Sequence, residues 1–223
     1  MQPLDLITFN TDEFELQGDE ENLRVWYTQA GDALGLYYFA LPPDIQADLE
    51  SEDELRVFYR NSVKESGLGM IQVDTLMVDG FRAIKTIFKI PQQPTGMTYI
   101  GSITVPFRDF SYVVKIQCPE PGITGIRDAV IFDREVINSL EDESFFDNWS
   151  QDPYDASIKS PLMRNRAESE EYDALFPDHP LSRTRSFLNQ IQQTLQVEEQ
   201  IKAQPRFKYA KPVSSGKNWW KFW

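Results

Sequence analysis

The chain has 223 residues, of which 41% are hydrophobic and 13% aromatic, so it can bury a sizeable core in one domain with extensions or in two small domains. This composition excludes collagen-like and wholly disordered classes, and the net charge of −13 argues against nucleic acid as a partner because an acidic chain repels phosphates. One cysteine, Cys118, and one histidine, His179, exclude an internal disulfide and the usual cysteine/histidine zinc shells.

The first predicted elements are two strands, which follow a weakly patterned acidic stretch at residues 1–21. Residues 23–28 alternate between aromatic or β-branched and polar side chains, and residues 34–41 form an apolar run of strand length. A turn at Gly31-Asp32 separates the two runs, and Pro42-Pro43 ends the second. This pattern predicts a β-hairpin.

The hydrophobic period changes to that of a helix over residues 51–66. Ser51 followed by Glu54 is the signature of a capping box, and Gly67 is suited to end the helix. Four residues share one face at the spacing i, i+3, i+4, i+7: Leu55, Phe58, Tyr59 and Ser62.

Four further strands are predicted between Met70 and Cys118, over residues 70–78, 81–90, 97–105 and 110–118. The first two are joined by Asp79-Gly80, a pair that tolerates the positive φ angles of a type I′ turn. Consecutive strands with such short connections must run antiparallel, because a parallel neighbour requires a long crossover. We therefore expect a meander.

Residues 124–140 are predicted to form a closing helix with an apolar stripe that is interrupted at Asp133. The stripe consists of Ile126, Ala129, Val130, Val136, Ile137 and Leu140. We expect this helix and the helix at residues 51–66 to cover the sheet. The fold class is then α+β, an antiparallel sheet flanked by helices, with a C-terminal helical extension and a flexible tail.

This order of hairpin, helix, meander and helix resembles the PsbP-like α/β/α sandwich, a family of extrinsic photosystem II proteins, a Ran-binding transport factor and bacterial secretion chaperones. The residues that carry the resemblance are 51–65, 71–83, 111–116 and the closing helix, within about residues 22–140. Members of the family mostly act by binding and share no catalytic constellation. The resemblance therefore implies a platform for a partner, and it does not extend to residues 141–223.

The C-terminal third begins with an acidic and aromatic segment at residues 141–155. We expect it to lie across the domain surface as a strap, and a peptide that awaits a partner is the alternative. A short helical turn is predicted at residues 168–176. A longer amphipathic helix follows, with Asp178 as N-cap and Pro180 in the first turn.

The apolar seam of this last helix is formed by Leu181, Thr184, Leu188, Ile191 and Leu195. Fewer than three heptads are weak evidence for a coiled coil, so we expect the seam to dock on the protein's own core, with self-association or a partner helix as alternatives. The chain then divides into an α+β sandwich domain at residues 1–140, a strap and amphipathic helix at 141–203, and a flexible basic-aromatic tail at 204–223.

The tail is the sharpest compositional feature of the chain. Six cations without any acid lie in it and just before it, at Lys202, Arg206, Lys208, Lys211, Lys217 and Lys221. After the hinge-like Ser214-Ser215-Gly216, three of the five tryptophans fall in the last five residues. The candidate partner- or membrane-binding residues are Lys217, Trp219, Trp220, Lys221, Phe222 and Trp223.

Three kinds of target suit these tail residues: a pocket on another protein, a lipid headgroup boundary, or stacked bases, the last opposed by the acidic body. The remaining alternative is that the tail folds back on its own domain.

Catalytic chemistry has few candidates in this sequence. His179 at a helix start suits a structural role, and Cys118 ends an apolar strand face as a small buried side chain. The run Arg164-Asn165-Arg166, with Arg183 and Arg185, has the residue types for a phosphate, although nearby acids oppose it. The usual nucleotide, calcium and nucleophile motifs are absent, so we expect no cofactor, no metal and no catalytic residues.

The sequence therefore favours a non-enzymatic protein-binding or adaptor module, with an acidic body and the tail as an attachment point. The alternatives are an immunity protein or secretion chaperone that masks a basic partner, and a carboxylate-dependent hydrolase. No apolar run reaches the ~18 residues of a membrane span, and the N-terminus lacks a signal-peptide pattern, so we expect a cytoplasmic location.

Overall fold

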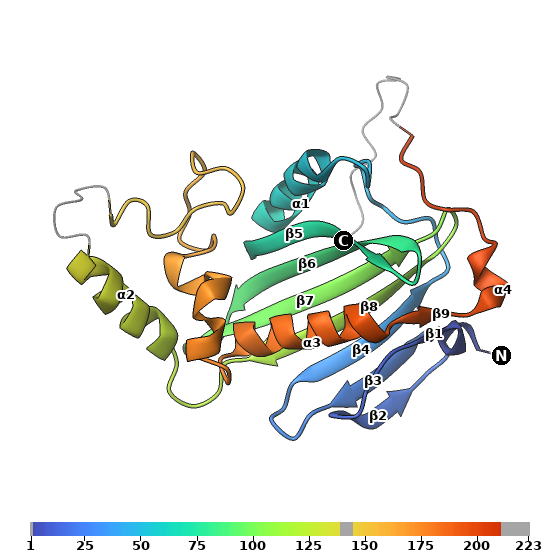
Figure 1. Cartoon of the computed structure of the whole chain (residues 1–223), viewed down its shortest axis with the longest axis horizontal. Helices are drawn as coiled ribbons and strands as arrows, with labels where there is room; N and C mark the ends of the chain where they lie inside the picture. Colours follow the sequence, from blue (N-terminus) through green and yellow to red (C-terminus); the bar gives the residue numbers. More distant parts are fainter. Residues whose placement is uncertain (1, 139–144, 211–223) are drawn as a thin grey trace.

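The computed structural model describes residues 2–138 and 145–210, and its centre is an antiparallel sheet of seven strands (Figure 1). The strand order is β2-β3-β4-β8-β7-β6-β5. The strands are β2 (Glu15–Asp19), β3 (Leu23–Tyr27), β4 (Ala33–Phe39), β5 (Gly69–Val78), β6 (Phe81–Pro91), β7 (Met97–Pro106) and β8 (Ser111–Pro119). The predicted α+β class, the hairpin and the meander are confirmed, and β4 joins the two by pairing with β8.

The predicted turn between β5 and β6 is present. Asp79 and Gly80 both have positive φ, 44° and 78°, as the turn of a two-residue hairpin requires. The acidic N-terminal stretch contains structure that its weak pattern did not indicate. It forms η1 (Pro3–Leu6), β1 (Ile7–Thr8) and β2, and β1 pairs with the distant β9 (Gln196–Val197).

Helix α1 (Glu52–Ser66) begins and ends as predicted. The Ser51 hydroxyl accepts a hydrogen bond from the Glu54 N–H at 3.3 Å, and Gly67 ends the helix with a φ of 68°. Leu55 and Val63 are buried with side chains of β5 and β6, so α1 covers one end of one sheet face.

The other face of the sheet is covered by α3 (Pro180–Thr194), which lies in front of the strands in Figure 1. Leu181, Leu188 and Ile191 are buried in the main core, so docking of the seam on the protein's own core is confirmed. The helix can approach closely because β7 has Gly101 beneath it, where a Cβ would lie 2.7 Å from the Leu188 side chain. The N-cap is His179 and not Asp178, since the His179 Nδ1 accepts the Leu181 N–H.

The expectation that the closing helix covers the sheet is wrong. Helix α2 (Ile126–Asn138) is present, but it lies at one end of the molecule beside the short helix η2 (Arg166–Glu168) (Figure 1). Its apolar stripe faces solvent at Ile126, Val130 and Ile137. Leu140, the last residue of the predicted stripe, lies outside the described residues. The place on the sheet is taken by α3, which is longer and has a continuous apolar seam.

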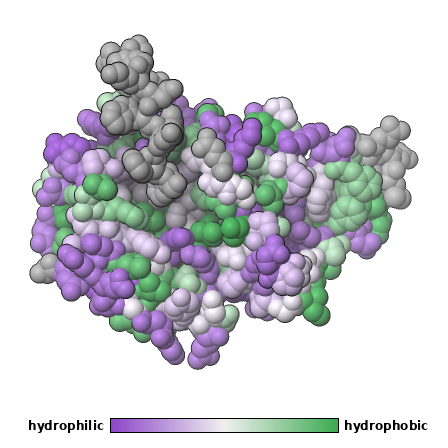
Figure 2. Space-filling view, turned by 180° about the vertical axis from the view of Figure 1, so that it is seen from behind, coloured by the Kyte–Doolittle hydropathy of each residue, from purple (hydrophilic) through white to green (hydrophobic). Residues whose placement is uncertain are grey.

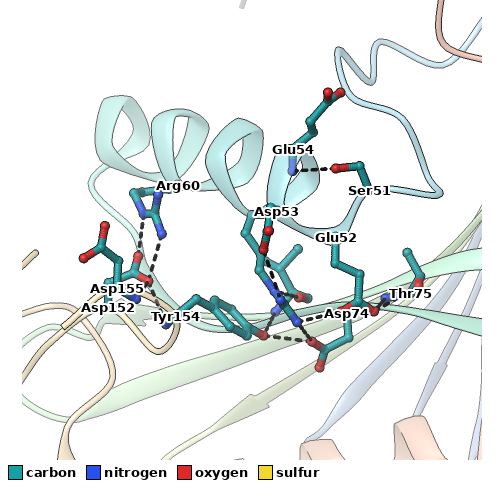
Figure 3. A network of polar contacts seen from close by, with 12 residues as sticks. Ser51, Glu52, Asp53, Glu54, Arg60, Asp74, Thr75, Asp152, Tyr154 and Asp155 are labelled. Atoms are coloured by element: carbon teal, nitrogen blue, oxygen red, sulfur yellow. Dashed lines mark hydrogen bonds and ion pairs between the residues drawn. The ribbon is translucent and has the colours of Figure 1, made fainter. Parts of the chain in front are cut away.

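The predicted strap is confirmed for its described part. The Asp152 carboxylate forms two hydrogen bonds to the Arg60 guanidinium on α1, at 2.6 and 3.0 Å (Figure 3). The Tyr154 hydroxyl accepts the Val73 N–H at 2.7 Å and donates to Asp74 on the edge strand β5. Residues 141–144 of this segment lie outside the described residues.

Two short helices complete the described chain, η3 (Glu170–Leu175) at the predicted helical turn and α4 (Glu199–Lys202) after β9. The division into units at residues 140 and 203 stays a prediction. Within residues 2–138 and 145–210, no helix combines the length and the apolarity needed to cross a membrane.

Candidate protein-binding site

Helix α2 is attached to the rest of the protein by a buried arginine. Arg127 is 1% exposed, and its guanidinium donates hydrogen bonds to the carbonyls of Ala167 and Ser169 and to the Ser182 hydroxyl at 2.7–2.9 Å. The same guanidinium forms an ion pair with Asp173 at 2.9 Å. A desolvated guanidinium with this many partners strongly fixes the first turn of the helix.

Two acidic side chains of α2 also point inward. Asp128 accepts a hydrogen bond from the Asn165 amide at 3.0 Å, and Glu135 accepts one from the Tyr172 hydroxyl at 2.9 Å. Burial, with the nearby charge of Glu168, raises the pKa of Asp128 to about 6. The inward side of α2 therefore combines these charged side chains with two apolar ones, the fully buried Ile131 and Phe132, whose ring packs on Phe145 and Trp149.

A second buried polar group, formed by Lys89, Tyr99 and Glu168, joins the sheet to the segment that contacts α2. Glu168 of η2 accepts two hydrogen bonds from the Lys89 ammonium at 2.7 and 2.8 Å and one from the Tyr99 hydroxyl at 2.7 Å. Lys89 and Tyr99 belong to β6 and β7, so this group joins the sheet to η2 and, through η2, to α2.

The consequence of this orientation is an apolar surface that we call the α2 face. It comprises three residues of the helix, Ile126 (49% exposed), Val130 (51%) and Ile137 (63%), and is preceded by the exposed Ile123 (81%). Phe146 is also exposed (68%), and its ring packs on Phe132. Figure 2 shows hydrophobic side chains gathered at the end of the molecule where α2 lies. An amphipathic helix with its apolar side toward solvent is typical of a protein-interaction site.

The predicted tail residues, Lys217, Trp219, Trp220, Lys221, Phe222 and Trp223, all lie outside the described residues. The structure does show where the preceding segment runs. The Pro205 carbonyl accepts the Arg108 N–H at 3.0 Å, and the Arg206 guanidinium lies 3.4 Å from the centre of the Phe81 ring.

The C-terminal segment also lines a cavity of about 520 Å³ beside the β5–β6 turn. Its walls include Met77, Phe81, Arg82, Arg206, Lys208 and Tyr209. Apolar and cationic groups are therefore mixed where the described chain ends.

The two reactive residue types that the sequence singled out both lie in structural positions. His179 caps α3, and burial together with the charges of Arg127 and Arg183 lowers the pKa of its imidazole to about 3. Cys118 is fully buried, and burial beside Asp32 raises the pKa of its thiol to about 12. Residues 2–138 and 145–210 contain no group of three or more His, Cys, Asp or Glu side chains placed to hold a metal.

The α2 face was missed by sequence reasoning because an apolar stripe at helical spacing predicts burial. The only local signal was Asp133, which interrupts the stripe and is exposed in the structure. The partners of Arg127 lie 40 or more residues away in the chain, so no local pattern indicates that its side of the helix is the buried one.

Comparisons with known proteins assign no family to this chain. No family model matches it, and no curated protein matches significantly. Among solved structures, a protein from Bacteroides thetaiotaomicron VPI-5482 aligns with a TM-score of 0.34 and 9% identity, over 55% of this chain and 41% of that chain. The present chain thus spans less than half of that protein, and a likeness at this level carries no argument.

Proposed function

We propose that this protein is a non-enzymatic protein-binding or adaptor module whose α2 face docks into an apolar groove of a partner protein. The observation that carries the proposal is the orientation of α2, in which Arg127 is buried while Ile126, Val130 and Ile137 are about half or more exposed. Exposure of these apolar side chains to water is unfavourable in the free protein. Burying them against a partner would therefore favour binding.

Recognition has a second part in this proposal, the tryptophan- and lysine-rich tail at residues 217–223. Its residue types suit an aromatic anchor on a protein surface, or contact with a lipid headgroup region. The resemblance to PsbP-like binding proteins supports the same class of function. A cytoplasmic location also remains part of the proposal.

The α2 face is tested by Val130→Glu, with Val57→Glu as the matched control. Val57 is an exposed valine on α1, at 49% exposure against 51% for Val130, so both variants place a charge on an exposed helix position. The partner is first isolated on the immobilised full chain, and its affinity for each purified variant is then measured. We expect Val130→Glu to weaken binding by about tenfold or more and Val57→Glu by less than about twofold.

Thermal unfolding of both variants should match the parent, because neither side chain is packed. Equal binding by the two variants would contradict the role of the α2 face. If light scattering shows a dimer that only Val130→Glu dissociates, the occupant is a second copy of this chain and the proposed adaptor role is wrong.

The tail is tested separately by deleting residues 217–223. The proposal predicts weaker binding to the partner, or to vesicles with anionic lipids, with little change in thermal unfolding. Unchanged binding in both assays would exclude the tail from recognition.

The salt dependence of binding distinguishes docking of the α2 face from the alternative function, in which the acidic surface masks a basic partner. Docking of the apolar α2 face should depend little on salt, whereas an acidic surface on a basic partner loses affinity steeply as salt rises.

A further inference from the structure

The sequence grouped four arginines as candidates for phosphate binding: Arg164, Arg166, Arg183 and Arg185. In the structure they form two pairs with different roles. Arg183 pairs with Asp32 at 2.8 Å and Arg185 with Asp173 at 2.9 Å, so these two arginines are used within the fold. Arg164 and Arg166 instead line a cavity of about 350 Å³, together with Asn148, Trp149, Gln151 and Asn165.

The backbone explains why these side chains converge. Ser150 and Asn165 form an antiparallel bridge, flanked by hydrogen bonds from the Arg166 N–H to the Trp149 carbonyl and from the Gln151 N–H to the Arg164 carbonyl. Side chains alternate along such a ribbon, so the residues on either side of the bridge point to the face opposite to it. Trp149 therefore lies across from Arg166 and Gln151 across from Arg164, all on one face.

The opposite face of the ribbon is anchored in the protein. Asn165 is 7% exposed, its amide donates to Asp128, and its side-chain oxygen accepts the Glu168 N–H at 3.0 Å. The ribbon is thus held by the same buried groups that hold α2, which makes the cavity a preformed site and not a surface fluctuation.

The charges in this cavity are not neutralised as they are elsewhere. Arg164 is half-buried and has no carboxylate within 4 Å among the described residues, and the carboxylate nearest to Arg166 is Glu135 at 4.0 Å. Arg127, Arg183 and Arg185, by contrast, have carboxylates at 2.8–2.9 Å. Within the described residues, the charge of Arg164 is thus not balanced by a carboxylate within 4 Å, and that of Arg166 is only weakly balanced by Glu135.

We propose that this cavity binds a phosphate monoester group between the guanidiniums of Arg164 and Arg166. Guanidinium N–H groups match the oxygens of phosphate in a fork, and a dianion complements two such groups. The Gln151 amide adds a neutral donor. The Trp149 ring packs on Phe132 and Phe145, and its remaining exposed part at the cavity would contact an organic group attached to the phosphate. The site shares no residue with the α2 face, although Trp149 and Arg166 contact α2 at Phe132 and Glu135.

The test is a titration of the ¹⁵N-labelled full chain with inorganic phosphate and with phenyl phosphate, at constant ionic strength. We expect saturable shifts of the amides at residues 148–151 and 164–166 and of the Trp149 indole N–H. Arg164→Gln should weaken binding by about tenfold or more. Arg108→Gln is the matched control, since Arg108 is exposed and paired only with Asp109, and it should change binding by less than about twofold.

Arg164→Lys keeps the charge but loses the fork, and we expect it to bind with intermediate affinity. This variant keeps the test informative if Arg164→Gln is poorly folded. Tighter binding of phenyl phosphate would assign the site to an organic phosphate, and equal binding would assign it to free phosphate.

Shifts that are unaffected by Arg164→Gln, that map to other residues, or that stay linear to about 50 mM ligand would overturn the proposal. None of these results depends on the α2 face, so the two proposals fail separately.

Discussion

Charged side chains hold the C-terminal third of this protein against its sheet. Lys89 and Glu168 are 2% and 0% exposed, and their charged groups lie 2.7 Å apart. Removing one member of such a pair leaves an uncompensated buried charge, which typically costs about 3–5 kcal/mol. These residues therefore fix the position of η2, and Arg127 fixes α2 against it.

Asp128 provides a test of these buried charges that depends on pH. Because its folded-state pKa is raised from 3.8 to about 6, the carboxyl stabilises the fold less once it is ionised, and stability is lost as pH rises from about 4 through about 6. Asp128→Asn stays neutral. We expect the variant to be more stable than the parent by about 1–3 kcal/mol at pH 7.5, with no difference at pH 3.5.

Urea unfolding followed by far-UV circular dichroism at the two pH values measures this difference. A variant that is less stable than the parent at pH 7.5 would show that the ionised carboxylate is favoured by its surroundings.

At the scale of secondary structure, the two sides of a helix are distinguished by the partners available to them. On α2, Ile126, Val130 and Ile137 are exposed, while Arg127, Asp128 and Glu135 meet hydrogen-bonding groups of residues 165–173 and Ser182. On α3 the apolar side meets the sheet directly. The apolar stripe of α2 therefore faces solvent, whereas the apolar stripe of α3 faces the sheet.

The described part of the strap, residues 145–155, is a further element that polar contacts hold in place. Asp152 is 1% exposed and accepts hydrogen bonds from Arg60 and from the Tyr154 and Asp155 N–H groups (Figure 3). We expect Asp152→Ala to increase amide exchange in the strap by about tenfold or more, because the buried ion pair to Arg60 of α1 is lost while only the Arg56–Tyr154 contact to that helix remains among those described. Amides of β7 and β8 should exchange as before.

Asp155→Ala is the matched control for the strap, since Asp155 lies in the same segment, its carboxylate accepts hydrogen bonds from Ser157, and it interacts with Arg60 only at longer range. Hydrogen exchange read by mass spectrometry distinguishes the two variants. Equal effects of both substitutions would mean that the Arg60–Asp152 pair does not hold the strap.

At the scale of the whole molecule, one core joins the sheet to α3. Leu188 is fully buried against β7 at Gly101, although it lies in the segment that the sequence separates from residues 1–140. Leu188→Ala should lower the free energy of unfolding by about 2–5 kcal/mol. If the two parts unfold as one unit, slow amide exchange in β7 should accelerate as much as exchange in α3.

The control for this prediction is Leu175→Ala, which removes a 58% exposed leucine and should change stability by less than about 0.5 kcal/mol. Faster exchange confined to residues 180–194 would show that α3 unfolds separately, as the division at residue 140 implies.

The sequence alone determined most of the elements and their local pairing, because these depend on neighbours a few residues apart. Alternation over residues 70–118, Asp79-Gly80 at positive φ and the Ser51 cap all predicted what the structure contains. Only the tertiary structure decided which side of each helix is covered. A hydrophobic period shows that two sides differ, but the side that is buried depends on partners that the chain brings from 40 or more residues away, as for Arg127 and Lys89. For that reason the α2 face became visible only in three dimensions. The sequence singled out the arginines of the second site, and the structure showed that Arg183 and Arg185 are used within the fold while Arg164 and Arg166 line a cavity.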